Sequence, residues 1–196
     1  MRQVSAWRQS ESVWRGIFVL MVAGGLGACA TLSGGPLPEL AGWRLSPASL
    51  GASVRAVQQI RAEADGAAWR FQAVLEVSPE RLTLVGLSGF DRRVLTVRYD
   101  GKEFVEETDS RVPAGLGGAR ILQDLQLIYW PAPAITAALP AGFRLEEDGG
   151  ERRLLRGGSV VVRIRCANPI RLRGRCEYEA PAGNRRLTID SRDEDP

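Results

Sequence analysis

The sequence predicts a mainly β domain with one or two inserted helices, in which a curved antiparallel sheet wraps around a central apolar helix. The first observation is one helical stretch, residues 116–140, whose segment from Ala119 to Trp130 is apolar over most of its circumference. The second is that the rest of the chain after residue 54 consists of short strand patterns between turn signals. A helix that is apolar on several sides must be covered on several sides, and a bent sheet is the simplest cover.

Residues 1–28 have the features of an export signal. Arg2, Arg8 and Arg15 form a basic leader, and an apolar run follows from Gly16 to Leu26. The run is too short to cross a bilayer as a helix, which takes about 20 residues. A leader of this kind is removed from the mature protein, so it is excluded from the fold prediction.

The leader ends in Leu26-Gly27-Ala28-Cys29, which resembles the lipobox of bacterial lipoproteins. That resemblance implies that Cys29 becomes an acylated N-terminus, so the chain is anchored to membrane lipid and does not span the membrane. Ala30 stands where lipoproteins kept in the inner membrane carry Asp, so the implied location is the periplasmic face of the outer membrane. The alternative is an ordinary signal peptide followed by a chance cysteine.

Without the signal the chain has 168 residues, with 23 basic and 22 acidic side chains and a net charge of +1. The pI of about 9.0 is therefore partly a property of the leader. A nearly neutral chain gives no electrostatic case for binding nucleic acid. The predicted organisation is a signal peptide (1–28), an acylated Cys with a flexible Gly/Pro-rich tether (29–46), a single domain (47–190) and an acidic tail (191–196).

Short strands account for most of the predicted domain. From Trp69 to Val77 apolar and polar residues alternate, which predicts a strand with one apolar face. Turn signals such as Ser78-Pro79-Glu80, Asp100-Gly101 and Asp148-Gly149-Gly150 separate further segments of this kind. Strands are expected to begin near Val54 and to continue at 69–77, 81–87, 94–99, 102–108, 143–147, 152–155, 159–166, 174–180 and 185–190.

The helical insert divides the strands into two groups. Pro131 cannot donate the next backbone hydrogen bond and disfavours helical geometry at Trp130, so the first helix is expected to end there. Pro133 suits the first turn of a second, short helix that runs to Leu139. No Ser or Asp cap is visible before the first helix.

Arginines alternate with other residues along two neighbouring predicted strands, Arg163 and Arg165 on one and Arg171, Arg173 and Arg175 towards the other. One interpretation is a cationic strip for lipid phosphate or another anion. We favour a solvated strand face whose arginine stems cover apolar neighbours, because the charge of the mature chain is balanced.

Cys166 and Cys176 remain once Cys29 is acylated. In an oxidising compartment such a pair favours a disulfide, and both residues lie on the apolar side of their strands. A wide loop around Asn168-Pro169 is needed, since a tight turn would put the sulfurs out of register. The spacing is not Cys-x-x-Cys and the chain has no histidine, which argues against a redox or zinc site.

The absence of histidine also removes Ser-His-Asp and Cys-His catalysis and the usual general base at neutral pH. Glu106 and Glu107 are adjacent on a predicted strand and so point to opposite faces, which favours a solvated edge over a carboxylate pair. Asp124, on the apolar helix, is expected to cap a turn or to bond to a neighbouring strand. The chain is therefore predicted not to be an enzyme and to use no metal or cofactor.

The predicted sheet and helix enclose an apolar interior. Its candidate lining residues are Trp69, Phe71, Leu75, Leu82, Leu84, Phe104, Leu122, Leu125 and Tyr129. They form either a filled core or a cavity whose lid is the helix. Protein interiors are normally close-packed, which favours the filled core.

The segment ARILQDLQLIYWPAPAITAALPAGFRLEE, together with the lipobox and strands such as RLTLVGLSGFDRRVLTVRYDGKEFVEE, resembles a family of short Gram-negative lipoproteins. Members carry a domain-of-unknown-function label and often accompany aryl-polyene biosynthesis clusters. The likeness covers most of 50–191 and is most specific at 120–131. That family in turn looks like the LolA/LolB lipoprotein-carrier fold, which implies an incomplete barrel whose helices close a cavity for acyl chains.

Two hypotheses about function follow. The first is an outer-membrane lipoprotein that binds a hydrophobic ligand, an acyl chain or a polyene lipid, during lipid or lipoprotein transfer or assembly. The second is a ligand-free structural or scaffolding lipoprotein that contacts an envelope protein partner.

Overall fold

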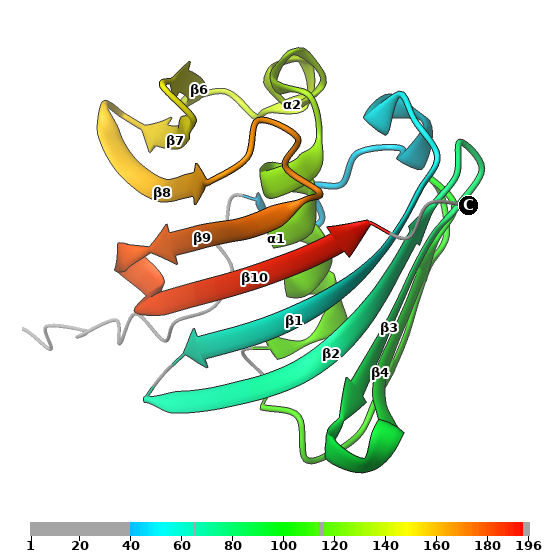
Figure 1. Ribbon diagram of the computed structural model, residues 1–196. Helices are drawn as coiled ribbons and strands as arrows, with labels where there is room; N and C mark the ends of the chain where they lie inside the picture. Colours follow the sequence, from blue (N-terminus) through cyan, green and yellow to red (C-terminus); the bar gives the residue numbers. More distant parts are fainter. Residues whose placement is uncertain (1–39, 65, 114–115, 194–196) are drawn as a thin grey trace, which may run out of the picture. The chain divides into compact units, whose positions relative to one another are not determined.

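The computed structural model describes residues 40–64, 66–113 and 116–193. Within this part of the chain, ten strands form one antiparallel sheet, and two α-helices connect its edges (Figure 1). The predicted signal peptide and Cys29 lie outside the described residues. The strands are β1 (Val54–Ala64), β2 (Ala67–Val77), β3 (Leu82–Ser88), β4 (Arg92–Tyr99), β5 (Phe104–Thr108), β6 (Phe143–Asp148), β7 (Glu151–Arg156), β8 (Ser159–Cys166), β9 (Gly174–Ala180) and β10 (Arg185–Asp193).

The sheet order explains why a helix lies on its inner face. The order is β5-β4-β3-β2-β1-β10-β9-β8-β7-β6, so the two edge strands, β5 and β6, follow one another in the chain. The connection between them must cross the whole sheet, and it carries α1 (Gly118–Tyr129) and α2 (Ala132–Ala138). Figure 1 shows α1 against the concave side of the curved sheet. The predicted mainly β fold, an open curved sheet around a central helix, is confirmed.

Helix α1 is enclosed on all sides. Its residues from Ile121 to Tyr129 are all buried, including the polar Gln123, Asp124 and Gln126. A polar side chain is tolerated at such a position only when it is hydrogen-bonded, and each of these three makes at least one hydrogen bond.

Residues 40–46 pack along α1. Leu40, Trp43 and Leu45 are buried in the core. The amide N–H of Leu45 donates to Gln126 Oε1 at 2.9 Å, and Gln126 Nε2 donates to the carbonyl of Leu45 at 2.7 Å. Gln123 Nε2 donates to the carbonyl of Leu40. The packed domain thus begins before residue 47, and residues 40–46, predicted as part of a flexible tether, are ordered by these contacts.

The last strand is longer than predicted. Strand β10 continues to Asp193, and Ser191 is buried beside Tyr129 and Gln58. The predicted acidic tail therefore begins later than residue 191, because these residues still pair with β1.

The N-terminus of α1 is capped from a distant strand. Glu106 on β5 accepts hydrogen bonds from the amides of Gly118 (2.7 Å) and Ala119 (3.1 Å), two donors with no partner inside the helix. Burial acts to raise the pKa of Glu106, but bonds from Thr108 and these two amides outweigh it and lower the pKa. Glu106 is exposed and lies on an edge strand, as expected, but the sequence did not indicate that it caps the helix.

Candidate functional site

The interior of the half-barrel is mostly filled. Five of the nine predicted lining residues, Leu75, Leu82, Leu84, Leu122 and Leu125, are at most 1% exposed and pack in one core cluster. Phe71 and Tyr129 are also buried, and Trp69 and Phe104 are partly buried at its margin. The structure brings the nine residues into one core but not around one open space.

A narrow apolar crevice remains where α1 begins. Its volume is about 10 Å³, and among the described residues its lining is entirely apolar. The sheet contributes Trp69, Phe71, Val94 and Leu95, and the other wall consists of Val112, Leu116 and Ile121. The sequence predicted Trp69 and Phe71 as lining residues but missed the other five. Val94 and Leu95 are consecutive buried residues, so they break the alternation expected of a strand with one apolar face and were not predicted as lining residues.

A buried ionic cluster fixes α1 to the sheet. Asp124 Oδ2 accepts from Arg185 of β10, at 3.0 Å from Nε and 2.6 Å from Nη2. Arg120 Nε lies 3.5 Å from Asp124 Oδ1. Burial raises the pKa of the neighbouring Tyr178 well above its ordinary value, and the charge of Asp124 raises it further. Asp124 bonds to a neighbouring strand, and its partner Arg185 gave no signal in the sequence.

Tyr129 belongs to a second buried network. Gln58 Nε2 donates to its hydroxyl at 2.9 Å, and Ser191 Oγ lies 3.1 Å from the same oxygen. Burial raises the pKa of Tyr129 to about 12, against the opposing effect of these hydrogen bonds. The phenol is therefore neutral at physiological pH and serves packing and hydrogen bonding.

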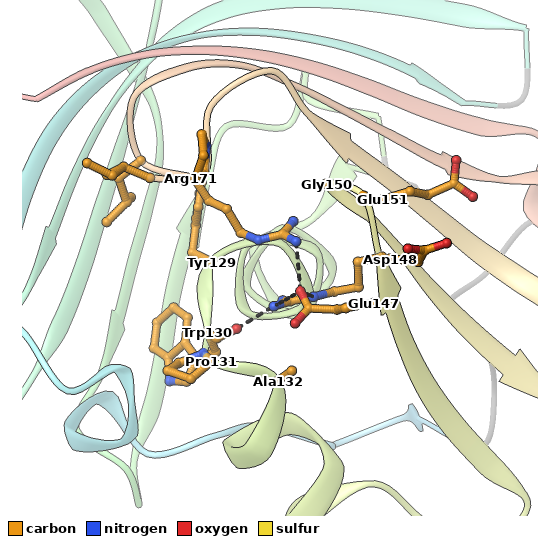
Figure 2. A pocket seen from close by; sticks show the side chains of 14 residues that line it. Tyr129, Trp130, Pro131, Ala132, Glu147, Asp148, Gly150, Glu151 and Arg171 are labelled. Atoms are coloured by element: carbon orange, nitrogen blue, oxygen red, sulfur yellow. Dashed lines mark hydrogen bonds and ion pairs between the residues drawn. The ribbon is translucent and has the colours of Figure 1, made fainter.

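A charged pocket opens at the other end of α1, near its C-terminus (Figure 2). Its volume is about 490 Å³. The charged lining residues are Glu147, Asp148, Glu151, Arg152 and Arg171. The remaining lining residues are Tyr129, Trp130, Pro131, Ala132, Gly149, Gly150, Pro169, Ile170 and Leu172.

Arg152 forms the rigid base of this pocket. Its side chain is 2% exposed, and its Nη1 donates to the carbonyls of Leu127 (2.6 Å) and Trp130 (2.9 Å) at the end of α1. A cation here balances the partial negative charge of the helix C-terminus. Its Nε donates to Glu147 Oε1 at 2.8 Å. No feature of the sequence distinguished Arg152 from the exposed arginines near it.

The arginines singled out in the sequence have different roles. Arg163 and Arg165 pair with Glu151 at 3.3 and 2.7 Å, and Arg175 pairs with Asp190 at 3.1 Å. These contacts fit the favoured interpretation of solvated strand faces. Arg171 differs, because it turns into the pocket and donates to Glu147 Oε1 at 2.7 Å.

Cys166 and Cys176 form a disulfide bond. The two residues face each other across β8 and β9, with a Sγ–Sγ distance of 2.04 Å. The bond closes the base of the loop 167–173, which carries Ile170 and Arg171 to the pocket. The loop is wide, as the sequence required.

The part of the chain that the structure describes contains no group of three or more His, Cys, Asp or Glu side chains placed to hold a metal ion. In the same residues, every helix is too short or too polar to cross a membrane.

Fold and site together define a mainly β domain whose open, curved sheet encloses one helix. The chain belongs to the family described as "Protein of unknown function (DUF3261)", whose model matches residues 55–193. This confirms the expected family with a domain-of-unknown-function label in its coarse form. No curated protein matches the chain.

Solved structures give weaker likenesses. A LolA superfamily protein from Nitrosomonas europaea is 12% identical, with 82% of this chain and 92% of that one covered and a TM-score of 0.40. A DUF1329 family protein from Desulfovibrio piger is 8% identical, with 74% and 87% covered and a TM-score of 0.31. Scores this low carry no functional argument.

Proposed function

We propose that the chain is an outer-membrane lipoprotein, anchored through acylated Cys29, that binds the hydrophobic part of a lipid between α1 and the sheet. The ligand class is an acyl chain or a polyene lipid, and the role is lipid or lipoprotein transfer or assembly. The observation that carries the proposal is the crevice at the start of α1, whose described lining is wholly apolar.

The crevice must widen to take a chain, and its wall is suited to this. Val112, Leu116 and Ile121 belong to the connection between β5 and α1 and to the first turn of the helix, not to the sheet. Each buried methylene of a ligand contributes about 0.8 kcal/mol. An acyl chain of ordinary length can therefore offset the displacement of a few side chains.

Binding is tested with the methyl ester of a fluorescent fatty acid, which has no carboxylate. Val112→Phe fills the crevice and is expected to weaken binding at least tenfold. Val105→Phe is the matched control, because Val105 is an exposed residue of β5 and is expected to leave binding unchanged. A correctly folded wild-type chain that takes up no probe would contradict the proposal.

The anchor is tested separately. Cys29→Ser is expected to abolish incorporation of labelled palmitate and to move the protein from the outer-membrane fraction to the soluble periplasm, since one peptide tether without acyl chains has no membrane affinity. Membrane fractionation and metabolic labelling are the measurements. An unlabelled wild-type chain, or a Cys29→Ser variant still in the membrane fraction, would rule this anchor out.

The filled core favours a second candidate, a non-enzymatic scaffolding lipoprotein that contacts an envelope protein. Crosslinking in intact cells would recover one specific partner for a scaffold. A chain that binds the neutral probe and yields no such partner supports the first function.

A further inference from the structure

Two guanidinium groups meet on one carboxylate oxygen in the charged pocket. Glu147 Oε1 lies 2.7 Å from Arg152 Nη2 and 2.7 Å from Arg171 Nη2 (Figure 2). Arginine forks of this kind match the oxygens of phosphate and carboxylate groups. One glutamate cannot neutralise two arginines, so Arg152 and Arg171 together keep an excess of positive charge. Burial and the charge of Arg171 lower the pKa of Arg152.

The surrounding segment is also positive. Residues 143–173, which include β6 to β8 and the following loop, contain eight arginines and four acidic residues, a net charge of +4. Residues 40–142 contain eleven of each sign. Of the other two acids lining the pocket, Glu151 is held by Arg163 and Arg165, and Asp148 lies at the β6–β7 turn. The lining itself has three acids and two arginines, so the site favours an anion once Glu147 is displaced, with Glu151 already paired with Arg163 and Arg165.

Glu147 is placed so that it can leave. Its side chain is 37% exposed, and it belongs to β6, the edge strand, whose partner in the described sheet is β7. Rotation of its side chain into solvent would leave the buried Arg152 without this carboxylate, so it requires that another anion take its place. Arg152, in contrast, is held by the carbonyls at the end of α1 and stays in position.

One flank of the pocket is apolar. Pro131, Ala132, Pro169, Ile170 and Leu172 line it, and Ile170 is 58% exposed, the highest value among the large hydrophobic side chains described. The disulfide holds the base of the loop that carries Ile170 and Arg171. A pocket that combines an apolar flank with a few charged groups is typical of a small-molecule binding site.

We propose that this pocket binds the oxyanion of an anionic amphiphile, a phosphate or carboxylate head group, between Arg152 and Arg171, and that Glu147 is the internal counterion that the ligand replaces. The apolar flank then contacts the first carbons of the ligand. The pocket lies at the opposite end of α1 from the crevice, and the inference does not rest on the function proposed above.

The test uses the chain from residue 29, with Cys29→Ser, and isothermal titration with three probes: dihexanoyl phosphatidic acid, dihexanoylglycerol and inorganic phosphate. Phosphatidic acid is expected to bind at least tenfold more tightly than either of the others. Arg171→Gln is expected to weaken this binding at least tenfold, and Glu147→Gln, which removes the competing charge, to strengthen it about tenfold. Arg175→Gln, a change at an exposed ion pair, is the matched control and should have no effect.

The outcomes separate the possible sources of the anion. Equal affinity for inorganic phosphate would assign the site to a free anion and overturn the amphiphile. Phosphatidic acid binding that is unchanged in both Arg171→Gln and Glu147→Gln, with the thermal midpoints of both variants preserved, would overturn the pocket itself. Loss of neutral-probe binding in Val112→Phe with phosphatidic acid binding intact would show that the two sites are independent.

Discussion

Replacing Asp124 by alanine is expected to destabilise the fold by about 3–5 kcal/mol, because it leaves the charge of Arg185 in the core without this carboxylate. The side chains of Arg185 and Asp124 are 2% and 1% exposed. Water cannot replace the lost partner there without opening the contact between α1 and β10. An effect of this size is a large fraction of the 5–15 kcal/mol that stabilises a typical domain.

A second arginine–aspartate pair of similar geometry provides the control. Arg175 Nε and Nη2 each lie 3.1 Å from an oxygen of Asp190, but these side chains are 57% and 47% exposed. Asp190→Ala is therefore expected to cost at most about 1 kcal/mol. Urea unfolding, followed by tryptophan fluorescence with the disulfide oxidised, measures both. Equal costs for the two substitutions would show that burial does not decide the contribution of Asp124.

The β-meander and the helix could be predicted because both depend on local patterns. Alternation from Trp69 to Val77 identified a strand that the structure places at Ala67–Val77. Pro131 predicted a helix end at Trp130, one residue beyond Tyr129, the last residue of α1. Strand order was the harder part, since it depends on which edges the helical connection joins. An apolar helix that must be covered on several sides was sufficient to indicate a curved sheet.

The polar contacts around α1 could not be predicted in the same way. Gln123 and Gln126 are polar residues of an otherwise apolar helix, and both are buried because residues 40–46 bring backbone groups to them. Periodicity shows which face of a helix is apolar. It does not show whether a segment distant in the sequence supplies hydrogen-bond partners to the polar side chains on the other face. The contacts of Glu106 with the N-terminus of α1 and of Arg152 with its C-terminus could not be predicted for the same reason.

The candidate site could also be predicted only in part. Composition indicated an apolar interior, but whether side chains fill it depends on their shapes, and among the described residues a narrow crevice is left beside Trp69 and Phe71. The charged pocket joins the end of α1, the β6–β7 turn and the loop 167–173. These segments are far apart in the sequence, so no motif marks the pocket.

Trp130→Ala is expected to destabilise the chain by about 3–5 kcal/mol, the usual cost of removing a buried aromatic side chain. Trp130 is fully buried, and its indole N–H donates to Ser49 Oγ at 3.0 Å and to the carbonyl of Ser46 at 3.2 Å. It follows the last residue of α1, and its own carbonyl accepts from Arg152. The substitution thus leaves a cavity at the point where the helix end, residues 46–49 and the base of the charged pocket meet.

Trp130→Phe separates packing from hydrogen bonding, because it keeps an aromatic ring and removes the N–H. Its expected cost is about 1–3 kcal/mol, from partly lost volume and from the Ser46 carbonyl losing a donor. Urea midpoints compared at unchanged m-value give both numbers. If Trp130→Ala cost no more than Trp130→Phe, the ring would contribute little to packing, and the N-terminal segment would be held to α1 chiefly through Gln123 and Gln126.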